Sequence, residues 1–230
     1  MNFLIPLFIL ATIPGTGTES PEKASTTDPL TYPSLYYEIQ IAVLNQETDL
    51  ELFFNEEVEN YINLFLFERR DIFLGYFVKS EEFFPLFEKF LKEYHLPEEI
   101  KYLPVLESGL SPYAVSPSEA VGLWQFKEPT GRAYGLEINS FVDERTDPEL
   151  STIAACKYLN RLFSEFNNWN LSLLAYNAGP TTIRNARNKA GKPDDYTSIQ
   201  PYLTIPAQKY LPALVAIIYL FHNSQSHFTF

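Results

Sequence analysis

Cysteine is almost missing from this chain of 230 residues, which holds a single one, Cys156. One cysteine can form neither an intramolecular disulfide nor a cysteine-based zinc site, and we interpret Cys156 as a small buried residue on a helix. The three histidines, His95, His222 and His227, show no spacing typical of metal ligands. The sequence therefore predicts no metal site and no cofactor.

Positive charge and glycine are also scarce. Lys and Arg number 17 against 29 acidic residues, which gives a net charge of −12, and no basic cluster is present. A nucleic-acid partner would need a basic face, so we expect none. Nine glycines are too few for a turn-rich β fold. Hydrophobic residues make up 46% of the chain, with 19 Phe and 15 Tyr, which predicts a large core rich in aromatic side chains.

The N-terminus has the pattern of an export signal. Residues 3–14 are nearly all apolar and are followed by small and polar residues, a run too short to span a bilayer comfortably. We interpret residues 1–17 as a signal peptide, which predicts a periplasmic or secreted protein associated with the cell envelope. No Lys or Arg precedes the run, so an uncleaved signal that attaches the chain to a membrane is the alternative. A lipoprotein signal is excluded, because no cysteine lies near the predicted cleavage site.

Helical patterns follow a polar segment. Residues 18–32 are rich in Ser, Thr, Pro and Glu, and we interpret residues 18–35 as a disordered linker. Residues 36–95 contain apolar stripes at helical spacing, such as Val58, Tyr61, Ile62 and Phe65. Aromatic residues in such stripes could serve as platforms for sugars, but the spacing favours a helical core.

Capping residues predict further helices. Pro97 and two acids begin a helix that we expect to run to Ser108 and to end at Gly109, with a kink at Pro104. Asp147-Pro148 begins another helix, in which Asp147 is the cap. Asn170 is the expected cap of a short helix that ends at residue 178. The apolar run 211–221 suits a buried helix better than a membrane span.

Glu107 is the candidate catalytic residue. Ile100, Leu103 and Glu107 are spaced i, i+3 and i+7, which places a carboxyl group on the core-facing stripe of the helix. Burial and the negative end of the helix dipole both raise the pKa of a carboxylic acid. An acid that is protonated near neutral pH can protonate a glycosidic oxygen. The alternative is a structural ion pair between Glu107 and an arginine.

Three ordered blocks of residues surround this acid. They are Glu107-Ser108 with Leu110, Pro112, Ala114 and Ser116; Gly122-Leu123-Trp124-Gln125-Phe126 with Thr130-Gly131; and Ala175-Tyr176-Asn177-Ala178-Gly179-Pro180. In this order and spacing they resemble the lytic transglycosylase catalytic domain related to goose-type lysozyme, over residues 57–212. The resemblance implies a mainly α, lysozyme-like fold with at most a small β element, between residues 111 and 126. It also implies a catalytic domain over residues 96–225, with the helical segment 36–95 packed on it.

The resemblance implies a role for each matching residue. Glu107 matches the family's catalytic acid and base, and Tyr176 matches a tyrosine whose hydroxyl lies close to that acid. The residues implied to bind substrate are Ser108, Gly122, Trp124, Gln125, Tyr176 and Asn177. Other readings exist for three of them: Trp124 as a core anchor, Tyr176 with an internally satisfied hydroxyl, and Asn177 as a helix cap.

The implied reaction is cleavage of the β-1,4 bond between N-acetylmuramic acid and N-acetylglucosamine in peptidoglycan strands, with a 1,6-anhydromuramyl product. The implied enzyme is a lyase that takes part in cell wall turnover, and we expect it to be a monomer. A hydrolytic muramidase and a catalytically weakened peptidoglycan-binding protein are the alternatives. Two positions depart from the family pattern: Pro206-Ala207 replaces Glu-Thr, and Glu119 replaces a small residue and would be strained there if φ is positive.

Overall fold

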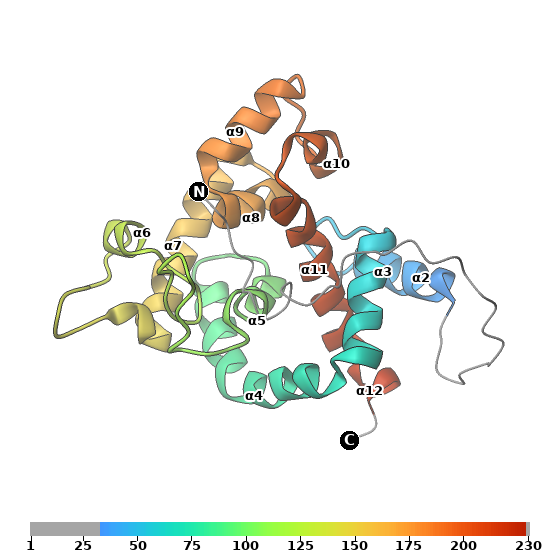
Figure 1. The fold of residues 1–230 in the computed structure, drawn as a ribbon, viewed down its shortest axis with the longest axis horizontal. Coiled ribbons are helices and arrows are strands. Elements are labelled where there is room, and N and C mark those ends of the chain that lie inside the picture. The colour runs from blue at the N-terminus through green and yellow to red at the C-terminus, as the bar shows by residue number, and fades with distance from the viewer. Residues whose placement is uncertain (1–32, 229–230) are drawn as a thin grey trace.

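The protein is mainly helical in the computed structural model, which describes residues 33–228 (Figure 1). The predicted signal peptide and residues 18–32 of the predicted linker lie outside the described residues. The α-helices are α2 (Ser34–Leu44), α3 (Glu56–Asn63), α4 (Arg70–Glu93), α5 (Leu103–Ser108), α6 (Glu128–Ala133), α7 (Pro148–Phe166), α8 (Trp169–Ala178), α9 (Pro180–Lys189), α10 (Tyr196–Ile199), α11 (Ile205–His222) and α12 (Ser224–His227). Between them lie a π-helical turn, η1 (Leu64–Glu68), and three 3-10 turns, η2 (Glu98–Tyr102), η3 (Glu144–Thr146) and η4 (Gln200–Tyr202).

Extended pairing within residues 33–228 is limited to isolated bridges. They join Val115 to Val121, Val121 to Phe126 and Ile138 to Asp143. The predicted fold class, mainly α with at most a small β element, is therefore confirmed for the described part of the chain. The third bridge lies outside the predicted window of residues 111–126, since a tight turn after α6 brings residues 138 and 143 together.

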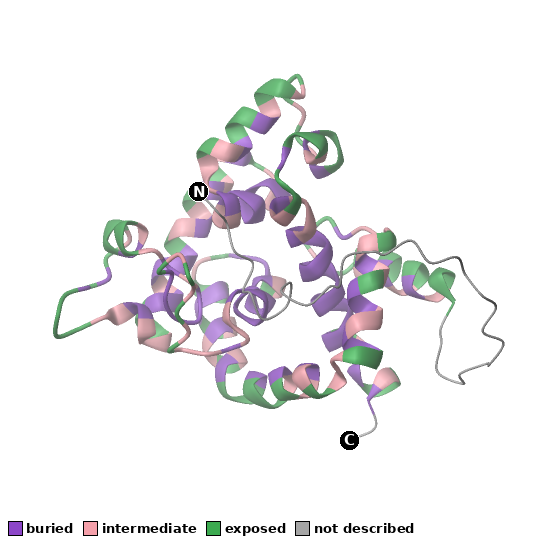
Figure 2. Cartoon of the chain, viewed as in Figure 1, coloured by how far each residue is buried: buried purple, intermediate pink, exposed green. Residues whose placement is uncertain are grey.

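The core is built around α11. Residues 210–221 of this helix are all buried, because the run is almost entirely apolar (Figure 2). Helix α3 packs along α11 with the predicted stripe of Val58, Tyr61 and Ile62, and α5 and α8 also contact α11. This arrangement places the short helix α5, which carries Glu107, between elements from both halves of the chain. No helix within residues 33–228 combines the length and the apolarity needed to cross a bilayer.

A long helix, α4, supplies much of the aromatic core. This helix contains buried aromatic residues along its length and continues past Pro85. Phe73 and Phe87 are fully buried, and α4 packs against α7. Helix α4 thus connects the N-terminal helices with those that surround the site.

Two predicted helix starts need correction. The single helix expected from Pro97 to Ser108 is a 3-10 turn followed by α5, because Pro104 has no N–H to donate and is accommodated in the first turn of a new helix. The expected end at Gly109 is confirmed, with φ of 60°. Helix α8 is capped by Asn168, not by Asn170, whose side chain donates instead to the carbonyl of Glu51. Asp147 caps α7 as predicted.

The segment between α5 and α6 is held by a buried arginine. Arg145 pairs with Asp143 at 2.7 Å and donates to the carbonyl oxygens of Glu119 and Phe126. Gly122 has φ of 85°, and a Cβ there would lie 1.9 Å from the carbonyl oxygen of Arg145. Glycine is therefore required at this position by a close approach of two backbone segments.

Glu119 occupies the left-handed region, with φ of 62°, and its side chain is exposed. A non-glycine residue is strained there by about 1–2 kcal/mol. We expect Glu119→Gly to raise the free energy of unfolding by about 0.5–1 kcal/mol, after the greater entropy of glycine in the unfolded chain is subtracted. Urea denaturation measures this. Glu119→Ala is the matched control, since it removes the carboxylate but keeps the Cβ; equal stabilisation by both variants would show that the charge, not the backbone, is responsible.

Candidate active site

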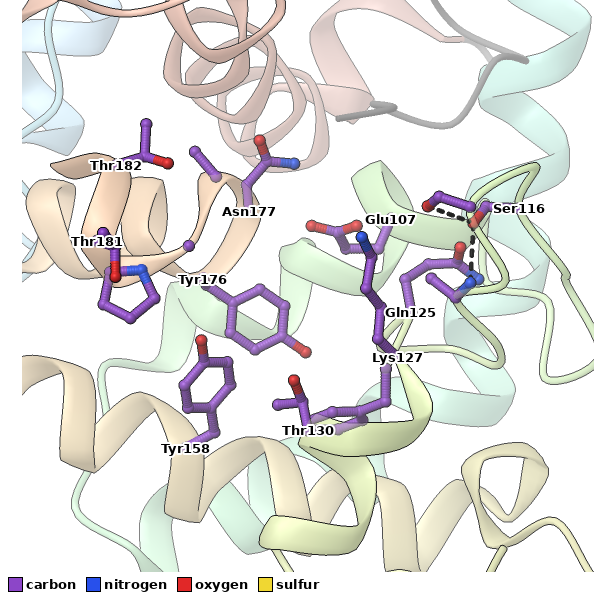
Figure 3. Close-up of a pocket in the computed structure, with 16 residues that line it drawn as sticks. Glu107, Ser116, Gln125, Lys127, Thr130, Tyr158, Tyr176, Asn177, Thr181 and Thr182 are labelled. Carbon is purple, nitrogen blue, oxygen red and sulfur yellow. Dashed lines mark hydrogen bonds between the residues drawn. The ribbon is translucent and has the colours of Figure 1, made fainter. Parts of the chain in front are cut away.

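A cavity of about 330 Å³ opens beside the C-terminal end of α5. Glu107 lies at its floor, residues 116–130 form one wall, and the end of α8 with the start of α9 forms the opposite wall (Figure 3). Hydroxyl groups dominate its polar lining, and they belong to Ser116, Ser118, Thr130, Tyr158, Tyr176, Thr181 and Thr182. Such a surface suits a ligand with many hydroxyl and amide groups.

Glu107 is almost completely buried, with 5% of its surface exposed. Burial raises the pKa of its carboxyl group to about 7, and a hydrogen bond from Tyr210 opposes this rise. The Tyr210 hydroxyl donates to Oε1 at 2.5 Å. The alternative of a structural ion pair is not supported, since no arginine or lysine forms an ion pair with Glu107 within residues 33–228. The carboxyl group can therefore give up and take back a proton near neutral pH.

Tyr210 was not predicted as a site residue. Burial raises the pKa of its phenol well above the usual value, and the nearby Glu107 raises it further, so the phenol stays protonated and acts as the donor. The sequence contains one signal for it: a tyrosine in a largely apolar, buried helix needs a partner for its hydroxyl. The spacing of 103 residues gives no indication that the partner is Glu107.

The second block of residues, 122–126, lies partly in the core and partly in the cavity wall. Trp124 is fully buried against Phe87, and its indole N–H donates to Thr152 at 2.9 Å. Gly122 is also buried and does not line the cavity. Both residues are packed in the interior of the protein. Trp124 and Gly122 therefore do not lie in the cavity wall, where the predicted contacts with substrate would be made.

Gln125 lines the cavity, with φ of 50°. Its side-chain nitrogen donates to the carbonyl oxygens of Gly122 and Ala114, at 3.0 and 3.3 Å. These bonds use both amide hydrogens and fix the side chain, so a ligand would meet the amide oxygen. Gln125 can thus accept a hydrogen bond from a sugar hydroxyl or an acetamide N–H.

Ser108 has a structural position. Its hydroxyl lies 3.0 Å from the carbonyl oxygens of both Pro104 and Leu123 and accepts from the Ser111 N–H. It links α5 to the second block and does not line the cavity. The expectation that Ser108 binds substrate is therefore not matched by its position, because its hydroxyl is satisfied by backbone groups.

Tyr176 and Asn177 extend into the cavity from the end of α8 (Figure 3). The Tyr176 hydroxyl donates to the carbonyl of Trp124 at 2.7 Å, and burial followed by the nearby Glu107 raises its pKa. Tyr176 is thus near the acid, as expected, but the hydroxyl that donates to the acid belongs to Tyr210. Oδ1 of Asn177 is buried in the cavity wall, and no group within residues 33–228 donates a hydrogen bond to it.

Glu107 supplies the one carboxyl group among the described residues that line the cavity. Three other acids between α5 and α7 form structural contacts: Asp143 pairs with Arg145, Glu128 pairs with Arg132, and Asp147 caps α7. Pro206 and Ala207, at the start of α11, do not line the cavity either. A mechanism that uses two facing carboxylates therefore has no second candidate in this wall.

Several known proteins with similar sequences or folds are named lytic transglycosylases. The model of the transglycosylase SLT domain family matches residues 85–199. Membrane-bound lytic murein transglycosylase D of Escherichia coli strain K12 is 36% identical over 141 residues, which cover 60% of this chain and 31% of that protein. Membrane-bound lytic murein transglycosylase F of Haemophilus influenzae strain 86-028NP is 28% identical over 196 residues, with coverage of 76% and 39%. The chain thus spans well under half of the length of these curated relatives.

The fold also matches a solved structure. The 70 kDa soluble lytic transglycosylase SLT70 from Escherichia coli superposes with a TM-score of 0.52 and 23% identity, over 63% of this chain and 25% of that one. At this identity the match establishes the fold, which is the lysozyme-like one expected from the sequence.

Proposed function

Because this chain belongs to the transglycosylase SLT domain family, we propose that it is a lytic transglycosylase that cleaves peptidoglycan. The cleaved bond is the β-1,4 bond between N-acetylmuramic acid and N-acetylglucosamine. The observation that carries this proposal is a buried carboxylic acid with a pKa of about 7, which is the one carboxyl group among the described residues of a cavity rich in hydroxyl groups. The names of the relatives support the substrate class.

The proposed reaction uses Glu107 twice. Its protonated carboxyl group gives the proton to the glycosidic oxygen, and the bond from that oxygen to C1 of the muramyl sugar breaks. The sugar's own 2-acetamido group stabilises the positive charge at C1, which is a known alternative to an enzyme nucleophile. The Glu107 carboxylate then takes the proton of the muramyl 6-hydroxyl, whose oxygen bonds to C1. The acid is restored, no water is consumed, and a 1,6-anhydro ring forms.

The masses of the products test this proposal. We expect digestion of purified sacculi to release muropeptides that end in 1,6-anhydromuramic acid, lighter by one water than reducing ends. Reducing ends would instead show a hydrolytic muramidase. Binding to sacculi without release of fragments would show a peptidoglycan-binding protein that has lost turnover.

Replacing Tyr210 with Phe tests whether Tyr210 controls the pKa of Glu107. The phenol donates to the carboxylate and lowers its pKa, so its loss should raise the pKa of Glu107 above about 7. The reaction needs the protonated acid, so activity falls as pH rises. In the variant this fall should occur at a pH about one unit higher than in the unsubstituted protein, because one pKa unit corresponds to the loss of a hydrogen bond to a charged group. The measurement is kcat/KM against pH on soluble glycan strands. An unchanged alkaline limb would show that Tyr210 does not govern this proton; Tyr196→Phe, which removes another buried phenol, is the control.

The place of action is also part of the proposal. We assign residues 1–17 to a signal peptide and the activity to the cell envelope, where peptidoglycan lies. The supporting observations are the apolar run 3–14 and the membrane-bound relatives. We further assign residues 96–225 to the catalytic domain and 36–95 to a helical segment packed on it. N-terminal sequencing of the mature protein tests the first assignment: a start at Met1 would contradict cleavage.

A further inference from the structure

The described lining of the cavity contains a cationic side chain, although the whole protein has a negative net charge. The chain has a net charge of −12, yet Lys127 bears the one cationic side chain among the described residues that line the cavity. The acid opposite, Glu107, is largely neutral below a pH of about 7. The lining formed by the described residues thus places one cationic side chain beside an acid that is largely neutral under mildly acidic conditions, in a protein whose overall field repels anions.

Lys127 is placed by a short, fixed element. It precedes α6 as the capping residue, with extended backbone, and Gly131 donates to its carbonyl oxygen at 2.8 Å. Figure 3 shows its side chain running across the cavity, with the ammonium group directed to the side on which Glu107 lies. The backbone is thus held by the turn of α6, while the four-carbon stem can adjust to a ligand.

The proposed substrate carries anionic groups close to the cleaved bond. A muramyl residue differs from N-acetylglucosamine by a lactyl ether, which ends in a carboxylate when no peptide is attached. When a peptide stem is attached, that carboxyl group is an amide and the carboxylates lie along the stem. Because the muramyl ring must sit beside Glu107 for cleavage, its lactyl group enters the same cavity as Lys127.

On this basis, and resting on the function proposed above, we propose that Lys127 binds a carboxylate borne by the muramyl residue and selects muramyl-containing strands. The hydroxyl groups of the lining bind either sugar, since both sugars present hydroxyl and acetamide groups. Lys127 is the group that distinguishes them by charge. It acts as a specificity-determining residue and takes no part in the proton transfers of Glu107.

Binding measurements separate this role from turnover. Calorimetry would use Glu107→Gln, which leaves strands intact, with and without Lys127→Met. The ligands are soluble strands with peptide stems, strands stripped of peptides by an amidase, and both kinds with every carboxyl group converted to a methylamide. Because Lys127→Met removes the hydrogen bond between the ammonium group and the carboxylate of the strand, it should weaken binding of the carboxylate-bearing strands by about 10-fold. Lys127→Arg should retain most of the affinity, and Lys92→Met, at an exposed position on α4, is the control for net charge.

Each outcome decides a specific point. Weaker binding of peptide-free strands alone identifies the lactyl carboxylate as the partner, and weaker binding of stem-bearing strands alone identifies the stem. Equal weakening on the methylamide strands, or unchanged affinity for all ligands, overturns the proposal. Cleavage by the unsubstituted protein is measured in parallel. Lys127-dependent binding without cleavage would leave this inference standing and overturn the proposed activity, whereas cleavage with Lys127-independent binding would do the reverse.

Discussion

Glu107→Gln is expected to reduce the rate of strand cleavage by about 10⁴-fold, the upper range for removal of a general acid or base. The amide has nearly the shape of the carboxyl group, but it cannot give a proton to the glycosidic oxygen. No other carboxyl group among the described cavity residues can replace it. Release of soluble fragments from sacculi measures the rate, and sedimentation with intact sacculi measures the binding, which should persist.

The matched control for this variant is Glu119→Gln. It makes the same chemical change at an exposed position outside the cavity wall, and its rate should equal that of the unsubstituted protein. If Glu107→Gln digests sacculi at the original rate, Glu107 is not the acid. If both variants lose activity, the effect comes from charge or folding and not from proton transfer.

The same substitution is expected to stabilise the protein at alkaline pH. Burial raises the pKa of Glu107 from 4.5 to about 7, so the folded state binds its proton more tightly than the unfolded state does. Below pH 4.5 the carboxyl group is protonated in both the folded and the unfolded state, so its burial as a charged group does not arise. As pH rises from there through 7, the folded state loses stability, and the loss reaches about 3 kcal/mol when each pKa unit counts as 1.36 kcal/mol.

Gln carries no charge at any of these pH values. Glu107→Gln should therefore match the parent protein in free energy of unfolding near pH 4 and exceed it by about 3 kcal/mol near pH 9, as order-of-magnitude expectations. Urea denaturation at a series of pH values measures this, again with Glu119→Gln as the control. A difference that is independent of pH would mean that the carboxyl group does not titrate with a raised pKa.

Local patterns allowed several parts of the fold to be predicted. The stripe on α3, the Asp147 cap and the Gly109 end follow from spacing and from backbone preferences of single residues. The break between η2 and α5 was missed, because a proline inside a helical pattern fits either a kink or a new first turn, and tertiary packing decides between them. The cap of α8 was missed by two residues, since Asn168 and Asn170 are equally good caps in isolation.

The acid of the site was predicted from the sequence, but several contacts around it were not. The burial of Glu107 was predicted from a single helical stripe, but the helix is broken before Leu103 and residues 103–107 are all buried. Gln125, Tyr176 and Asn177 line the cavity with Glu107. The contact of Tyr210 with Glu107 joins segments that no periodicity relates. Ser108 was expected to bind substrate, yet its hydroxyl is satisfied by the backbone, because matching a motif does not say which way a side chain points.

The bond between Tyr210 and Glu107 has a consequence for the order in which the protein becomes active. A ribosome delivers α5 about a hundred residues before it delivers α11, so a nascent or truncated chain holds the acid without the helix that orients it. The proposed cleavage of peptidoglycan therefore requires α11 to be synthesised and packed beside α5. Chains that terminate before residue 210 lack the hydroxyl group that donates to Glu107.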